Sequence, residues 1–137
     1  VDGGIVSYLC RLDRKIYSCV IEDICTNEVI LTEERIAHIK DHHPNDYERY
    51  HGFIPCMVQE PDFILRCDAY ATAFVLKSFK TEDNIVLRLI LRLQTSHDDP
   101  TYKNSVITFQ RIHAKEFRRL IAKAEREGKL LYRRLDL

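Results

Sequence analysis

Apolar and polar residues alternate with a period of two along the second half of the chain, and this pattern predicts β-strands. The strongest example is 85–93, which has one continuous apolar face and carries Arg88 and Arg92 on the reverse face. A polar turn joins this strand to another apolar segment at 72–79, as in a β-hairpin. A further strand is expected at 104–112. Because the reverse face of 85–93 carries two arginines, we expect a sheet that is covered on one side only.

The expected strand at 104–112 carries both apolar and hydrogen-bonding side chains. Strict alternation would send every second side chain to the same face of the sheet. The two predicted sets are Val106, Thr108 and Gln110 on one face, and Ile107, Phe109 and Arg111 on the other.

After this strand, the apolar residues recur with a period of about 3.6 residues, as in an α-helix. Residues 114–127 are predicted to form an amphipathic helix, and Gly128 is its expected C-terminal stop. The chain then closes with an edge strand at 129–135, whose lysine and arginine side chains discourage further strand pairing. The apolar stripe of the helix consists of Phe117, Leu120, Ile121 and Ala124.

The first half of the chain contains shorter helical patterns. The segment 32–43 is predicted to be a short helix, which a threonine caps at its start and the following Pro44 ends. Two further helical segments are expected at 46–51, ended by Gly52, and at 53–59.

The N-terminal residues 1–27 are predicted to be an accessory extension. Residues 5–12 and 15–21 are rich in β-branched and aromatic side chains, and an Asp-Arg pair between them could turn one segment onto the other as a β-hairpin. The main domain would then span 28–137.

Together these elements predict an α+β fold. In this fold, N-terminal helices pack on one face of a roughly four-stranded antiparallel sheet, and a late amphipathic helix precedes the last strand. Short extended segments at 28–31 and 62–66 lead into and out of the helical part.

Composition narrows the class of protein. The 137 residues, 45% hydrophobic and 31% charged, are enough for one globular domain with a core. No apolar run approaches the roughly 20 residues that a membrane-spanning helix needs. Five cysteines without a Cys-x-x-Cys pair predict reduced thiols and a reducing, cytoplasmic compartment. The chain does not begin with methionine, which is consistent with a piece of a longer polypeptide.

The formal net charge is zero, but the charge is unevenly distributed. Residues 21–68 carry a net charge of −7 and residues 111–134 a net charge of +6. A basic segment of this kind can attract phosphate groups. A solvated helix surface, or pairing between the two charged halves, explains the same pattern, and charge alone favours these simpler explanations.

Three of the six histidines, His38, His42 and His43, occur at the predicted helix or just beyond it. His38 and His42 share one side of that helix with Arg35. Their i, i+4 spacing could hold zinc, but Ile39 occupies the position where a zinc protease has its catalytic glutamate, and no third ligand with a recognisable spacing follows. The sequence also contains no Gly-x-Ser-x-Gly elbow and no glycine-rich phosphate loop.

With a zinc site, a serine nucleophile and a phosphate loop disfavoured, the type of catalysis that the sequence still allows is metal-free acid–base catalysis. Cleavage of RNA needs a base for the ribose 2′-OH, an acid for the leaving oxygen and cations for the phosphate. Histidine can serve as acid or base because it titrates near neutrality. Cations and a hydroxyl for the phosphate are expected on the strands, although each of these residues also has an ordinary structural explanation. These strand residues are Lys77, Arg88, Arg92 and Thr108.

Four motifs follow one another in order: Val29–Tyr47, Glu60–Leu65, Lys103–Gln110 and Leu131–Tyr132. This ordered set resembles the phage-associated nuclease families of the barnase–EndoU–colicin–RelE-like superfamily. The resemblance extends from about Val20 to the C-terminus. It implies a ribonuclease fold in which helices pack on a four-stranded antiparallel sheet, with no metal and no other cofactor.

On matching positions, the resemblance implies that His38 and His43 are acid–base residues and that Thr108 contacts the scissile phosphate. The family often has an arginine just before the histidine-proline pair, where this chain has His42. That difference leaves open which cation supports the phosphate. Lys77 is assigned from its strand position and not from the resemblance.

We therefore expect a metal-independent endoribonuclease, toxin-like or phage-encoded, that cleaves tRNA or another structured RNA. RNA is the expected partner, and the resemblance leaves open a cognate inhibitor protein and a larger parent polypeptide; no membrane partner is expected. The alternatives are a non-catalytic RNA- or protein-binding module on the same fold, and a domain that needs a host partner for activity. The expected catalytic residues are His38, His43, Thr108 and Lys77, and the expected substrate-binding residues are His42, Arg35, Arg88, Arg111 and Tyr132.

Overall fold

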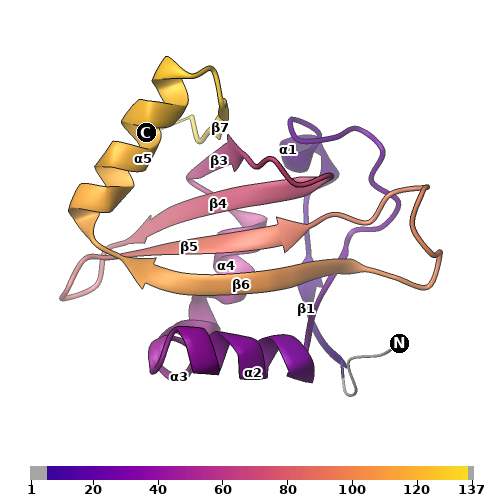
Figure 1. Ribbon diagram of the computed structural model, residues 1–137, viewed down its shortest axis with the longest axis horizontal. Coiled ribbons are helices and arrows are strands. Elements are labelled where there is room, and N and C mark those ends of the chain that lie inside the picture. Colours follow the sequence, from indigo (N-terminus) through magenta and orange to yellow (C-terminus); the bar gives the residue numbers. More distant parts are fainter. Residues whose placement is uncertain (1–5, 136–137) are drawn as a thin grey trace.

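A computed structural model describes residues 6–135 of the chain as one sheet with helices around it (Figure 1). The strand order across the sheet is β1-β2-β6-β5-β4-β3-β7, so both N-terminal strands lie beyond β6 and the last strand forms the opposite edge. The described strands are β1 (Val6–Arg11), β2 (Glu28–Thr32), β3 (Phe63–Arg66), β4 (Thr72–Phe79), β5 (Ile85–Arg92), β6 (Asn104–Ile112) and β7 (Leu130–Arg133).

The helices are short, with the exception of two. Figure 1 shows α4 behind the sheet, α2 along the β6 edge and α5 towards the side of β3 and β7. The helices are α1 (Arg14–Tyr17), α2 (Glu33–His42), α3 (Asp46–Tyr50), the 3-10 helix η1 (His51–Phe53), α4 (Ile54–Gln59) and α5 (Ala114–Arg126).

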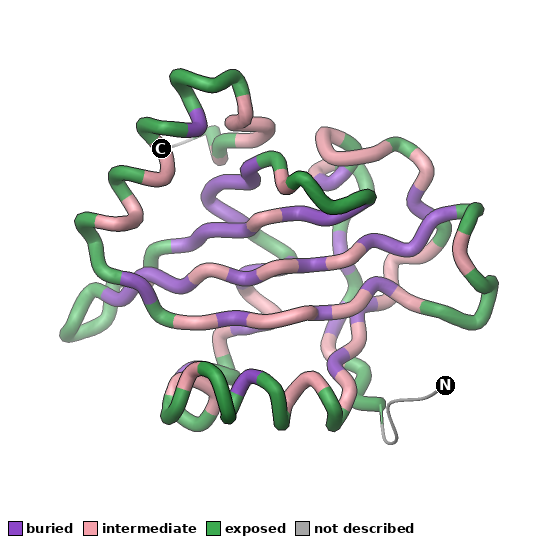
Figure 2. The backbone as a smooth tube through the Cα atoms, in the orientation of Figure 1, coloured by how far each residue is buried: buried purple, intermediate pink, exposed green. Residues whose placement is uncertain are grey.

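One face of the sheet, here called the core face, is buried along its length. Val75 of β4, Leu89 of β5 and Phe109 of β6 have no exposed surface and belong to one apolar cluster with Met57 of α4. Ile54, Met57 and Val58 turn towards this cluster because α4 presents them at helical spacing. The alternation of buried and half-buried residues is visible along β5 (Figure 2).

The other face, here called the open face, carries Arg88, Ile90 and Thr108. A second apolar cluster buries part of it, where Leu76 and Val86 pack with Ala124 of α5. The expectation of a sheet covered on one side only is therefore wrong at this end, because the apolar stripe of α5 also needs a surface to cover. Between α2 and α5, no helix of residues 6–135 crosses the near side of β4, β5 and β6 in Figure 1.

The class and several boundaries were predicted correctly. The fold is mixed α+β, the strands at 72–79 and 104–112 have the predicted bounds, and the late helix precedes the last strand. Gly128 follows α5 with a φ of 69°, a left-handed conformation that glycine adopts without strain. As predicted, β7 is an edge strand.

The number of strands and the purely antiparallel pairing were predicted wrongly. The sheet of the described residues has seven strands instead of roughly four, and β2 pairs with β6 in parallel. Gly52 does not end a helix but lies within the 3-10 helix that continues from α3.

The predicted N-terminal hairpin is also wrong. After β1, Asp13 caps the short helix α1 and the segment to residue 21 is not extended; residues 1–5 lie outside the described part. The partner of β1 is β2. Tyr17 is fully buried in the same cluster as the main sheet, and its hydroxyl donates to the Val58 carbonyl at 2.7 Å.

Candidate active site

Helix α2 brings the clustered histidines to the edge of β6. The Thr32 side chain accepts a hydrogen bond from the Arg35 backbone N–H at 3.2 Å, so the predicted N-cap is confirmed. Ile39 is fully buried in the main core and anchors the helix. Helix α2 starts where β2 ends and packs along β6, so its C-terminal residues lie beside that strand.

His38 and His42 form a stacked pair on the exposed side of α2. Their ring centroids are 4.0 Å apart with an interplanar angle of 26°. The His42 ring Nδ1 lies 3.0 Å from the His38 carbonyl oxygen, which favours the tautomer with a proton on that nitrogen. Arg35 is one turn earlier on the same side. This side therefore presents two imidazoles and a guanidinium.

His43 ends the helix and is less exposed than its neighbours. Its backbone N–H donates to the Ile39 carbonyl at 2.8 Å, and its φ of −134° leaves the helical region before Pro44, as predicted. Burial lowers the pKa of His43 below its ordinary value of 6.5, and the positive charge of Arg88 contributes to this lowering, as do His42 and His38. Asp46 acts in the opposite direction.

Arg88 and Thr108 lie on adjacent strands of the open face. Thr108 pairs with Ile90, and Arg88 pairs with Gln110, so the two side chains are diagonal neighbours on one face. The register shifts just beyond this group, because Ile90 pairs with Thr108 whereas Leu91 pairs with Val106. The bulge corrects the predicted alternation: Val106 and Phe109 both lie in the main core, and Thr108 is on the opposite face from Val106.

Two buried side-chain polar atoms of residues 6–135 have no hydrogen-bond partner: Nε of Arg88 and Oγ1 of Thr108. Buried polar atoms without partners are rare in folded proteins because each costs about 1–3 kcal/mol. The Arg88 guanidinium stacks on the Phe74 ring at 4.8 Å, and its pKa is lowered by burial while Glu116 at the start of α5 raises it. The Arg88 guanidinium and the Thr108 hydroxyl lie on one face, and both are suitable hydrogen-bond donors to the oxygens of a phosphate.

Lys77 does not join this group, and its assignment to the site is corrected. It pairs with Leu87 across β4 and β5 and so lies on the core face, one residue out of phase with Arg88. The residue is 8% exposed, and its ammonium group donates to the Glu60 carbonyl at 2.6 Å and to Asp62 Oδ1 at 3.1 Å.

Arg111 and Tyr132 also lie elsewhere. Arg111 pairs with Leu87 and donates to the Tyr50 hydroxyl at 2.9 Å, while its backbone N–H donates to Asp46 at 3.0 Å. Tyr132 is on β7 and packs against the main core. Four strand spacings, roughly 19 Å, separate β7 from β6. The structure therefore brings Arg88 and Thr108 together on the open face and puts His43 where the charge of Arg88 acts on it, whereas Arg111 and Tyr132 lie elsewhere.

Several neighbours of the site were missed by sequence reasoning. Phe74 supports Arg88 from β4, and Gln110 is its cross-strand partner. Asp46 and Glu116 are the two carboxylates whose charges act on His43 and Arg88. A signal for Phe74 existed, because strand parity in a β4–β5 hairpin places every second residue of each strand on one face. Asp46 follows His43 by three residues and lies beside it through a local turn, in which the Asp46 backbone N–H donates to the His43 carbonyl at 3.1 Å. No comparable signal existed for Glu116, which reaches Arg88 through tertiary packing.

All five cysteines are free thiols. Within residues 6–135, no group of three or more His, Cys, Asp or Glu side chains is arranged to hold a metal ion. None of the helices in the same range has the length and apolar character needed to span a membrane.

The chain was compared with models of known protein families. The model of a family described as "phage-Barnase-EndoU-ColicinE5/D-RelE like nuclease2" matches residues 11–133. That range includes α2, β5, β6 and all of the site residues described above. No curated protein and no solved structure matches the chain.

Proposed function

The chain belongs to the phage-Barnase-EndoU-ColicinE5/D-RelE like nuclease2 family, and from this premise we propose that it is a metal-independent endoribonuclease. The proposed reaction is transphosphorylation, in which the ribose 2′-oxygen attacks the adjacent phosphorus. The products are a 2′,3′-cyclic phosphate and a 5′-hydroxyl. Catalysis then requires one base, one acid and a site for the phosphate charge.

The proposal is carried by the unpartnered Arg88 Nε and Thr108 Oγ1, which lie on one face of the sheet, and by the charge of Arg88, which acts on His43. A phosphate oxygen would supply the hydrogen bonds that these two atoms lack. The guanidinium would neutralise charge that develops on the phosphorane, and the hydroxyl would donate to a non-bridging oxygen.

His43 is the proposed general base. Its lowered pKa keeps the imidazole neutral near pH 7, so that it can accept the 2′-OH proton. His38 is the proposed acid, which donates a proton to the departing 5′-oxygen. His42 stacks on His38 and orients it.

The basic surface of α5 supports RNA as the substrate. Five exposed cations lie along this helix, which begins directly after β6 and approaches Arg88 through Glu116. Cations on such a surface bind phosphates by releasing counterions. They are Lys115, Arg118, Arg119, Lys123 and Arg126.

The test is cleavage of tRNA and of a single-stranded RNA oligonucleotide by purified protein in EDTA. We expect products that end in a 2′,3′-cyclic phosphate. Replacing His43 with Gln should lower the rate roughly 10²–10⁴-fold. Binding of RNA without cleavage would favour a non-catalytic binding module, and activity that EDTA abolishes would contradict the metal-free reaction. Cleavage that requires cell extract would indicate a host partner.

The chain offers a matched control for the histidine stack. His51 stacks on Tyr47 at 4.9 Å and its Nδ1 lies 2.9 Å from the Tyr47 carbonyl, the same local arrangement as His42 on His38. Tyr47, however, packs against Phe109 on the core face. His42→Ala should therefore lower activity, whereas His51→Ala should leave it unchanged. Equal losses in both variants would assign His42 a purely structural role.

A further inference from the structure

A cavity of about 310 Å³ lies at the end of the open face. This volume is at the lower end of the range for sites that bind small organic molecules. Its walls come from β2, the end of β5, the loop between β5 and β6, and the start of β6. The lining residues used below are Ile30, Arg92, Gln94, Tyr102 and Ser105.

The cavity continues the surface that carries the proposed phosphate site. Ser105 pairs with Arg92, two residues along β5 from the pair of Thr108 with Ile90. Two residues of a strand span about 7 Å. A phosphate held by Arg88 and Thr108 would therefore have one of its flanking nucleosides at the mouth of this cavity.

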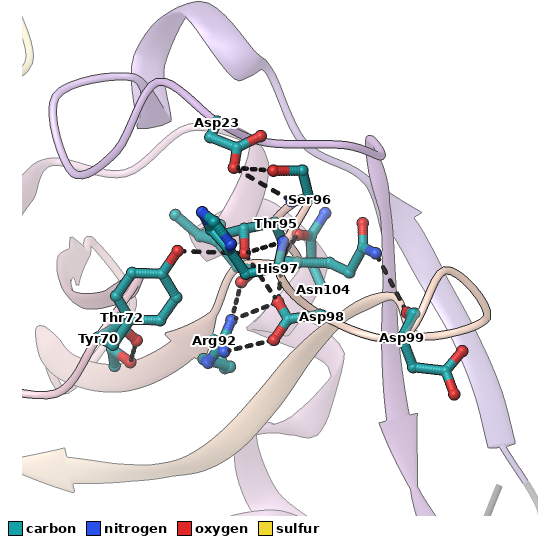
Figure 3. Close-up of polar contacts among 12 residues, drawn as sticks. Asp23, Tyr70, Thr72, Arg92, Thr95, Ser96, His97, Asp98, Asp99 and Asn104 are labelled. Atoms are coloured by element: carbon teal, nitrogen blue, oxygen red, sulfur yellow. Dashed lines mark hydrogen bonds and ion pairs between the residues drawn. The ribbon is translucent and has the colours of Figure 1, made fainter.

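The loop that forms one wall is held in place by side-chain hydrogen bonds (Figure 3). Asp98 lies between Arg92 and Thr95: its Oδ1 accepts from Arg92 Nη2 at 2.8 Å, and its Oδ2 accepts from the Thr95 backbone N–H at 2.8 Å. Asn104 accepts from the Gln94 backbone N–H at 2.8 Å. Ser96 donates to Asp23 at 2.6 Å and ties the loop to the N-terminal segment. A polar loop with this many fixed contacts forms a preorganised wall.

The chemistry of the lining favours a planar, largely apolar ligand with a polar edge. Tyr102 is 50% exposed and Ile30 is half-buried, so both offer apolar surface to the cavity. The lining is more apolar than polar. The Gln94 amide and the Ser105 hydroxyl add hydrogen-bonding groups at its walls. Nucleobases combine a π-face that stacks on aromatic rings with a hydrogen-bonding edge.

We propose that this cavity is a nucleobase-binding subsite, which takes the base next to the scissile phosphate and stacks it on Tyr102. The assignment of the base to a cleaved strand rests on the proposed ribonuclease function. The cavity itself, its apolar walls and its fixed loop do not depend on that function.

The test is titration of the full chain with each of the four free ribonucleosides. Binding is monitored by the NMR chemical shifts of the backbone amides in the 94–105 loop. Free nucleosides carry no phosphate, so binding is measured without cleavage. We expect saturable binding of at least one nucleoside. Tyr102→Ala should weaken it roughly 5- to 150-fold, the range for loss of one base–aromatic stack. Tyr102→Phe is the matched control, because it keeps the ring and should bind like the unmodified chain.

Two results would overturn the subsite. One is the absence of saturable shifts with all four nucleosides at millimolar concentration. The other is equal binding by Tyr102→Ala and Tyr102→Phe. These results are separable from the ribonuclease test: cleavage of RNA without nucleoside binding refutes only the subsite, and nucleoside binding without cleavage refutes only the nuclease proposal.

Discussion

Replacing Thr108 with valine should stabilise the fold and impair the reaction at the same time. The substitution exchanges a buried, unpartnered hydroxyl for a methyl group of similar shape. The unpaired hydroxyl costs about 1–3 kcal/mol in the folded state, and an added buried methyl contributes up to about 0.8 kcal/mol. Allowing for partial solvation of this half-buried residue, we expect a gain of roughly 1–2 kcal/mol in the free energy of unfolding.

Thr95→Val is the control with the opposite sign. Thr95 is fully buried, and its hydroxyl contacts Asp98 Oδ2 at 3.2 Å, the Tyr70 hydroxyl at 3.2 Å and the His97 backbone N–H at 3.3 Å. Replacing Thr95 with valine should lower the free energy of unfolding by about 1–3 kcal/mol, because these groups lose their hydrogen-bond partner. In thermal unfolding, each kcal/mol corresponds to roughly 3–5 °C for a chain of this size. The melting temperatures of the two variants should therefore move in opposite directions from that of the unmodified protein.

The activity of Thr108→Val should fall because the proposed phosphate donor is lost. Removal of one preorganised donor to a developing negative charge costs roughly 10²–10³ in rate in other enzymes. We expect kcat/KM for an RNA oligonucleotide to fall about 10²-fold. Thr108→Ser keeps the hydroxyl and should retain most of the activity. Destabilisation of Thr108→Val by more than 1 kcal/mol, or full activity in this variant, would refute the reasoning.

Two further predictions concern His43 and Lys77. The folded pKa of His43 lies below its unfolded value of 6.5, so the unfolded chain binds a proton first as the pH falls. The free energy of unfolding should therefore decrease as the pH falls from about 6.5 through the folded pKa. Urea titrations of His43→Gln should not show this part of the pH dependence. The same protonation should lower kcat/KM on the acid side of neutrality. Lys77→Met should lower the free energy of unfolding by roughly 2–3 kcal/mol. The loss is smaller than if Lys77 were the only cation bound to Asp62, because Asp62 keeps its ion pair with Arg134 at 2.9 Å. Its activity per folded molecule should be unchanged, and a loss of activity without unfolding would contradict the position of Lys77 on the core face.

The sequence was informative where a pattern depends on neighbours along the chain. The cap at Thr32, the break at Pro44 and the stop at Gly128 are local backbone effects, and all three were predicted. The same holds for the strand bounds at 72–79 and 104–112. Each of these depends on the conformational preferences of a few adjacent residues.

The site was predicted less completely, because sequence alternation does not say which faces of two strands coincide. Arg88 and Lys77 both lie on strands of the predicted hairpin, but their register puts them on opposite faces. The stacked pair of His38 and His42 could be anticipated, since helical spacing alone brings the two rings together. The nearness of His43 to Arg88 could not, since it depends on where α2 packs.

By itself the sequence determined the α+β class, the strands at 72–79 and 104–112, the late helix and the histidine cluster, since each of these elements depends mainly on residues close together in the chain. Tertiary structure alone decided the face on which Thr108 lies. Pairing with β5 puts Thr108 opposite Ile90 and so on the face of Arg88, and a bulge just beyond this pair turns Val106 to the core face. A shift of one residue in pairing reverses every subsequent side chain, and only contacts between strands distant in sequence select that register.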